Sequence, residues 1–164
     1  MMNAPPTRLE DVLFERTGAL RTYVILDGAS IPELPKVLEE LGPEYLCLFR
    51  GEVEPELAEV APYLVGLRRG EAFTEWLLRE GRGKPWGVFA LSKADPYVLA
   101  AHLTGLLVAD VPDGDKLYFR FYDPRVLKIF LPTCNKQQRE QMFGPVSTFV
   151  LELPDNDSVE VFHK

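Results

Sequence analysis

The sequence is poor in cysteine and histidine, with two of each in 164 residues. Cys47 lies inside an apolar run, where a buried thiol acts as a small hydrophobic side chain, and Cys134 lies beside Pro132 in an expected turn. Thiols in such different settings predict neither a disulfide framework nor a metal site. His102 falls on the apolar stripe of a predicted helix and His163 is the penultimate residue. A histidine-based catalytic site is therefore not expected.

Long apolar runs and a surplus of positive charge are also missing. No apolar run approaches the ~20 residues that cross a bilayer, and the N-terminal residues lack the basic and apolar regions of a signal peptide. The formal net charge is -7 and the pI about 4.9, whereas phosphate binding needs an excess of Lys and Arg on some face. We expect a cytoplasmic protein without nucleic-acid or membrane partners.

Glycine-rich phosphate loops and nucleophile elbows are absent as well. The turn after the first predicted strand, Asp27–Ser30, contains one glycine, whereas a phosphate cradle needs several close backbone approaches. No Gly-x-Ser-x-Gly segment supports a serine nucleophile, and no spacing of His, Cys and carboxylates resembles a metal site. These absences predict a protein that is not an enzyme, with no catalytic residue, no metal and no cofactor.

The composition that remains is that of an ordinary globular protein, with 46% hydrophobic and 26% charged residues. A chain of this length can bury a sizeable core without metals or disulfides. No internal repeat, low-complexity segment or long linker divides it. Residues 1–164 are therefore expected to form a single domain.

Strands and helices alternate along the sequence. The nearly continuous apolar run Tyr23–Leu26 is typical of a strand covered on both faces. The predicted strands are Leu20–Leu26, Tyr45–Arg50, Trp86–Ser92, Lys116–Tyr122, Val146–Leu153 and Val159–Phe162, and Tyr63–Leu67 is expected only as a short extended piece. Apolar spacing and capping residues predict helices at Thr7–Arg16, Pro32–Leu41, Glu52–Val60, Glu71–Glu80, Asp95–Leu106, Asp123–Leu131 and Asn135–Phe143.

This order predicts an α/β fold, a small three-layer domain with a mixed sheet. The N-terminal β-α-β-α-β part is expected to form a parallel sheet with helices on its faces. The C-terminal half is expected to add antiparallel strands to one edge of that sheet.

The densest group of polar side chains is Arg120, Asp123 and Arg125. In the strand Lys116–Tyr122, Arg120 and Tyr122 are expected on the same face. Asp123 precedes a proline, which predicts an N-cap and a helix start, and Arg125 in the first turn calls for a carboxylate partner. The group is either an Arg–Asp network that pins a strand to a helix or an exposed docking surface with arginine and tyrosine anchors. The two interpretations are compatible.

Asp27 follows the first strand, a place where functional carboxylates of α/β proteins often lie. It could act as the nucleophile or metal ligand of a phosphatase-like site, although Ala29 occupies the place of the usual second aspartate. The other interpretation is a turn carboxylate that accepts backbone N–H bonds. A small hydrolase that uses Asp27 with Arg120, Asp123 and Arg125 therefore stays open as an alternative.

Residues 119–127 read FRFYDPRVL, and Phe143-Gly-Pro145 follows after a helix. Together these segments resemble the hallmark of the family catalogued as domain of unknown function 4123. The resemblance covers roughly Leu20–Val150. Further segments fit the family in the same order: Leu26-Asp27, Leu46–Phe49, Ala61–Val65, Phe73–Leu77, Trp86-Gly87 and His102-Leu103.

The resemblance implies an adaptor chaperone of bacterial type VI secretion. Such a protein binds a toxic effector in the cytoplasm and helps to load it onto the VgrG spike at the tip of the secretion tube. Members of the family are not known as enzymes. The resemblance therefore implies that the motif residues bind partners or organise the fold: Arg120, Tyr122, Asp123, Arg125, Phe143 and Pro145.

The sequence departs from the larger family members in two respects. Many of them carry a further C-terminal lobe after the Phe-Gly-Pro element, whereas only residues 146–164 follow it here. Thr104 also stands where a basic residue is expected after His102-Leu103. An immunity-like protein that binds one toxin and blocks it is a further alternative to the adaptor.

Overall fold

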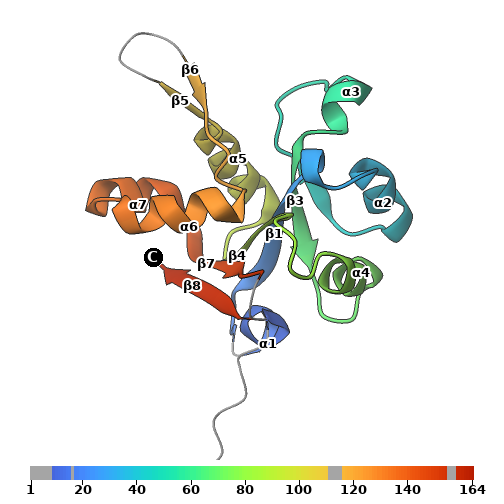
Figure 1. Ribbon diagram of the computed structural model, residues 1–164, viewed down its shortest axis with the longest axis horizontal. Coiled ribbons are helices and arrows are strands. Elements are labelled where there is room, and N and C mark those ends of the chain that lie inside the picture. The colour runs from blue at the N-terminus through green and yellow to red at the C-terminus, as the bar shows by residue number, and fades with distance from the viewer. Residues whose placement is uncertain (1–8, 16, 111–115, 155–157) are drawn as a thin grey trace, which may run out of the picture.

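A six-stranded antiparallel sheet lies at the centre of the protein (Figure 1). The structure is a computed structural model that describes residues 9–15, 17–110, 116–154 and 158–164. The strand order is β2-β3-β1-β4-β7-β8. The six strands are β1 (Arg21–Asp27), β2 (Tyr45–Cys47), β3 (Pro62–Leu67), β4 (Gly87–Ser92), β7 (Val146–Glu152) and β8 (Val159–His163).

Helices cover both faces of this sheet and enclose two apolar cores. One core is shared with α1 (Leu9–Phe14), α2 (Leu34–Leu41) and α4 (Ala72–Glu80), and the other with α5 (Pro96–Leu106), α6 (Pro124–Thr133) and α7 (Lys136–Phe143). The short helix α3 (Pro55–Ala58) connects β2 to β3. Because β1 is central and covered on both sides, six of its seven residues are buried, as its apolar sequence predicted.

A separate two-stranded hairpin of β5 (Val108–Asp110) and β6 (Lys116–Tyr118) follows α5. In Figure 1 the hairpin and α3 rise from the same end of the sheet. This is also the end at which β1 finishes and α6 begins. The hairpin therefore stands outside the main sheet, beside the residues of the candidate site.

The predicted parallel N-terminal sheet is wrong, because every neighbouring pair of strands is antiparallel. The extended piece at residues 63–67 is part of a full strand, β3, which lies between β1 and β2. In the same way β1 lies between β3 and β4. The connections through α2 and α4 thus each join two strands of the same direction, but an antiparallel strand lies between the two strands in the sheet.

The predicted strand Lys116–Tyr122 is also shorter than expected, because β6 ends at Tyr118. The N–H of Asp123 donates to the carbonyl of Arg120 over 3.1 Å and closes a tight turn. This turn stops the alternation of side chains, so that Phe121 and Tyr122 are both buried although they are adjacent.

The capping signals in the sequence are confirmed at three helices, one of which is α6 with its Asp123 cap. The Asp95 carboxylate accepts hydrogen bonds from the N–H groups of Tyr97 and Val98 at the start of α5, and Asn135 forms a capping box with Gln138 at the start of α7. Helix α6 continues to Thr133, two residues beyond its predicted end. The predicted start of the first helix at Thr7 lies outside the described residues, and so does Asp113-Gly114, a pair that favours a hairpin turn.

Among the helices that the structure describes, none is both long enough and apolar enough to cross a membrane.

Candidate functional site

Asp27 is the last residue of β1, and its buried carboxylate is the centre of the candidate site. Its Oδ1 accepts the N–H of Ala29 over 3.0 Å, and its Oδ2 accepts the hydroxyl of Ser30 over 2.8 Å. Gly28 is needed beside it, because a Cβ atom there would collide with the carbonyl oxygen of Ala61, the residue just before β3. The turn after β1 therefore holds the carboxylate in one fixed position.

Arg120 comes from the segment after the hairpin, 93 residues away in the sequence, and pairs with Asp27. Its Nη2 donates to Asp27 Oδ2 over 2.5 Å. The Asp27 side chain is only 3% exposed, whereas the Arg120 side chain is 46% exposed. The carboxylate of this ion pair is thus buried and fixed in the protein, whereas the outer part of the guanidinium is open to solvent.

The Tyr122 ring packs against the guanidinium of Arg120. The guanidinium carbon lies 5.7 Å from the centre of the Tyr122 ring, a cation–π distance. The Tyr122 hydroxyl is hydrogen-bonded to the Tyr118 hydroxyl over 3.0 Å. Burial raises the pKa of Tyr122, and its contact with Tyr118 and the negative charge of Asp27 raise it further. The tyrosine therefore stays neutral at physiological pH.

Asp123 caps α6 and binds Arg125 rather than Arg120. Its Oδ1 accepts the backbone N–H of Arg125 over 2.9 Å, and the guanidinium of Arg125 contacts both carboxylate oxygens over 3.0 and 2.8 Å. Burial raises the pKa of the Asp123 carboxyl, but the hydrogen bonds and charge of Arg125 outweigh burial and leave the pKa below its usual value. Asp123 is therefore ionised, which is what an N-cap at the positive end of a helix requires.

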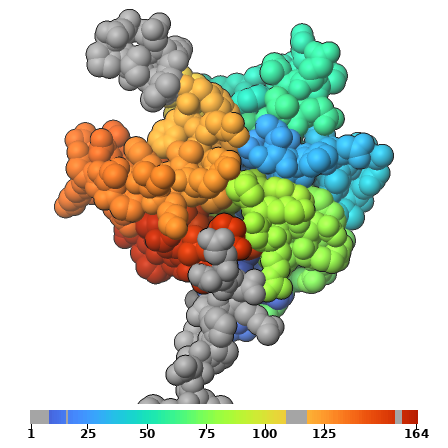
Figure 2. Space-filling model, in the orientation of Figure 1, coloured from blue at the N-terminus to red at the C-terminus, as the bar shows by residue number. Residues whose placement is uncertain are grey.

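The predicted Arg–Asp network thus exists as two separate pairs, Asp27–Arg120 and Asp123–Arg125. The first pair fixes the segment after the hairpin to the end of β1, and the second fixes the start of α6. Figure 2 shows that, at the surface, the segment after β6 (light orange) lies directly against the segment after β1 (blue). We call Asp27, Tyr118, Arg120, Tyr122, Asp123 and Arg125 the anchor cluster.

Phe143 and Pro145 belong to another part of the fold. Phe143 is fully buried and its ring lies edge-on to Phe149, with 5.0 Å between the ring centres. The carbonyl of Pro145 accepts the hydroxyl of Ser92 over 2.6 Å. Gly144 between them has a φ of +49° and lies so close to the His102 ring that a Cβ atom would collide with it. These residues pack the turn between α7 and β7 onto α5 and β4.

An open apolar groove of about 400 Å³ lies beside the anchor cluster. Leu48 and Phe49, which follow β2, line it together with Val108 and Tyr118 of the hairpin and with Gly105 of α5. The rings of Phe49 and Tyr118 meet edge-on, 6.4 Å apart. We call this cavity the hairpin groove. Tyr118 belongs to both the groove and the anchor cluster, so the cluster positions one wall of the groove.

Two residues that hold this region together were missed in the sequence. Ser30 bonds Asp27, and Thr104 of α5 donates its hydroxyl to the carbonyl of Leu48 over 2.9 Å. Thr104 therefore fixes the far wall of the hairpin groove to α5. Ser30 lies three residues after Asp27, so the Asp-x-x-Ser spacing is a local signal for this contact. The partner of Thr104 lies 56 residues away, and nothing local in the sequence marks that contact. Gly105, a glycine within a helical pattern, is an unusual residue next to Thr104 that the sequence does show.

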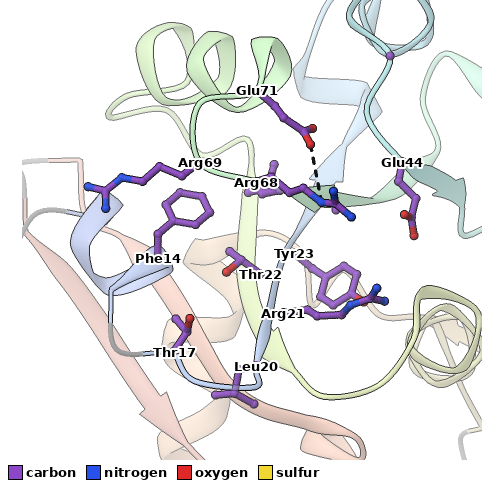
Figure 3. A pocket seen from close by; sticks show the side chains of 13 residues that line it. Phe14, Thr17, Leu20, Arg21, Thr22, Tyr23, Glu44, Arg68, Arg69 and Glu71 are labelled. Carbon is purple, nitrogen blue, oxygen red and sulfur yellow. Dashed lines mark ion pairs between the residues drawn. The ribbon is translucent and has the colours of Figure 1, made fainter.

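A second cavity, of about 390 Å³, lies at the opposite end of the sheet, where β1 begins. Figure 3 shows Arg21, Glu44, Arg68 and Glu71 around it. The Arg68 guanidinium lies 3.8 Å from the Glu71 carboxylate, and Arg69 turns away to Glu10 of α1, 3.3 Å distant. Positive and negative side chains alternate around this cavity, so it does not present a field of one sign.

The chemistry available in the anchor cluster is that of a fixed polar network. Both oxygens of Asp27 already accept hydrogen bonds from protein donors, and both oxygens of Asp123 are bound by Arg125. No group of three or more His, Cys, Asp or Glu side chains able to hold a metal occurs among the described residues. The parts of the cluster open to solvent include the outer edges of Arg120 and Arg125 and the ring of Tyr118.

Fold and site together define a three-layer α/β domain in which a buried aspartate at the end of the central strand pairs with an arginine just after a projecting hairpin. The chain belongs to the family described as Domain of unknown function (DUF4123), whose sequence model matches residues 22–141. This confirms the family expected from the motif at residues 119–127. No curated protein and no solved structure matches the chain.

Proposed function

We propose that the chain is an adaptor chaperone that binds a type VI secretion effector in the bacterial cytoplasm and helps to load it onto the VgrG spike protein. The secretion role comes from the family resemblance. The observation that carries the binding role is the anchor cluster, in which the family motif holds the hairpin beside an open apolar groove. Apolar grooves with a few fixed polar groups are typical binding sites.

Exposed apolar side chains near this region support a protein partner. Val108 and Tyr118 of the hairpin are 47% and 43% exposed. Grouped apolar side chains at the surface mark interaction sites in proteins that otherwise stay soluble through their charge, and this chain carries a net charge of -7.

The hydrolase alternative is less well supported than the adaptor. A nucleophilic or basic carboxylate needs a free oxygen directed at substrate, whereas the oxygens of Asp27 are bonded to Ala29, Ser30 and Arg120. The immunity-like alternative shares a protein-binding surface with the adaptor, so only its biological outcome distinguishes it.

Co-purification tests the proposal. The tagged chain is co-expressed with the effector and the VgrG protein encoded by neighbouring genes, and we expect it to retain both. Deletion of its gene is expected to abolish effector delivery while the effector is still made, and cell fractionation is expected to place the chain in the cytoplasm.

Failure to capture either protein, together with normal delivery in the deletion strain, would contradict the adaptor role. Protection of cells from the toxin without any effect on delivery would instead identify an immunity protein.

A further inference from the structure

Gly105 in the last turn of α5 has no structural reason to be glycine. A Cβ atom built at this position would meet nothing within 4 Å, and its φ is not positive. It is also not the capping residue of the helix, which is Leu107. Glycine destabilises a helix relative to alanine. A glycine kept in open space on a helix surface is explained when another backbone approaches it closely.

The place that Gly105 faces is the hairpin groove. The main chain of Val108 is available to an approaching strand there. The N–H of Phe119 donates to the carbonyl of Leu107, so these two residues form a hydrogen-bonded pair. The next pair, Val108 and Tyr118, is therefore a non-hydrogen-bonded pair, and the N–H and C=O of Val108 point away from β6. An extended segment can pair with such a free strand edge and place alternate side chains in the apolar groove.

Arg50 lines the groove, but the chain that follows it is acidic. This chain carries four exposed carboxylates, those of Glu52, Glu54, Glu56 and Glu59. The run lies in and next to α3, which stands at the same end of the sheet as the hairpin (Figure 1), and we call it the acidic border of this end. A basic side chain next to the apolar residues of a partner segment would be attracted to this border.

From the glycine, the free strand edge and the acidic border we infer that the hairpin groove binds an extended segment of the effector. The segment has apolar side chains at alternate positions and a neighbouring Lys or Arg, and its backbone passes over Gly105 and pairs with Val108. This inference rests on the proposed adaptor function and names the surface and the kind of cargo segment.

Substitutions at Gly105 test it without removing a native contact. The probe is the full-length effector from the neighbouring gene, titrated against the purified chain. We expect Gly105→Ala to weaken binding a few-fold and Gly105→Leu at least tenfold, because the larger side chain fills the groove. Both variants should melt at or above the wild-type temperature, since the site has open space and the helix gains propensity.

Gln141→Leu is the matched control. Gln141 is exposed on α7, which contacts β7 and so lies toward the other edge of the sheet from β2. This variant adds the same leucine to a helix surface without a change in charge, and it should bind the effector like the wild type.

A photoreactive amino acid at position 108 identifies the occupant. We expect crosslinks to one short effector segment of the stated composition. Unchanged effector binding by Gly105→Leu, or crosslinks to the VgrG protein instead, would overturn the groove assignment and leave the adaptor function standing. A wild-type chain that does not bind the effector would overturn the adaptor function, and the groove assignment with it.

Discussion

Replacing Arg120 by alanine is the sharpest test of the anchor cluster. The substitution leaves the Asp27 carboxylate buried, with a side chain that is 3% exposed, and removes the only cation bonded to it among the described residues. The hydrogen bonds from Ala29 and Ser30 remain. The hairpin also loses its connection to the end of β1. We expect lower stability with little change in the specificity of partner binding.

The magnitude follows from the unequal burial of the pair. Breaking a fully buried ion pair by removal of one partner costs about 3–5 kcal/mol. Because the Arg120 side chain is 46% exposed, solvent already screens part of this interaction. We therefore expect the free energy of unfolding to fall by about 2–3 kcal/mol. In a protein of this size such a loss lowers the melting temperature by roughly 4–12 °C.

Urea unfolding at pH 7 measures this loss, with Arg125→Ala as the control. The Arg125 side chain is 70% exposed, so solvent screens its pair with the mostly buried Asp123 carboxylate more strongly than the Arg120 pair, and its removal should cost less. A double-mutant cycle of Arg120→Ala with Asp27→Asn should give a coupling energy of about 1 kcal/mol or more. A coupling near zero, or wild-type stability combined with lost partner binding, would refute the structural role and make the cluster a docking site first.

Three further variants test single contacts by thermal or urea unfolding. Asp123→Ala should lose about 1 kcal/mol of capping energy at pH 7. Because the folded pKa of Asp123 is lowered, this difference should shrink as the pH falls below about 4, and a constant difference would contradict the charge argument. Gly28→Ala should cost about 1–3 kcal/mol through its collision with Ala61, and wild-type stability would show that the turn can relax. Tyr122→Phe should cost about 1 kcal/mol through the lost bond to Tyr118; an unchanged midpoint would show that this bond adds nothing.

The sequence predicts the individual helices and strands of this protein better than it predicts which strands pair with each other. The central strand, most helices and three helix caps follow from apolar spacing and from local side-chain bonds between residues two or three positions apart. The strand order does not, because β3 is short and its pairing with β1 depends on residues about forty positions away. β3 lies between β1 and β2 and is antiparallel to both, so strands that were expected to be parallel neighbours are separated in the sheet.

The sequence indicated which residues form the candidate site but not which of them form ion pairs with each other. The motif at residues 119–127 indicated an Arg–Asp network, and the Asp123 cap is a local contact that the sequence shows directly. The partner of Arg120 is Asp27, 93 residues away. Only the folded chain brings them together, so sequence reasoning could place Arg120 and Asp27 in one site only as a hypothesis.

The central position of β1 has a consequence for synthesis on the ribosome. Its partners are β3 and β4. This apolar strand therefore has no complete pairing partner until residue 67 has been made, 40 residues beyond Asp27. At typical translation rates this takes about 2–8 s. The carboxylate of Asp27 waits longer, until Arg120 emerges. A nascent chain that stops between β4 and residue 120 holds both strands that flank β1 but not the cation that pairs with Asp27, so it buries this carboxylate without its charge partner.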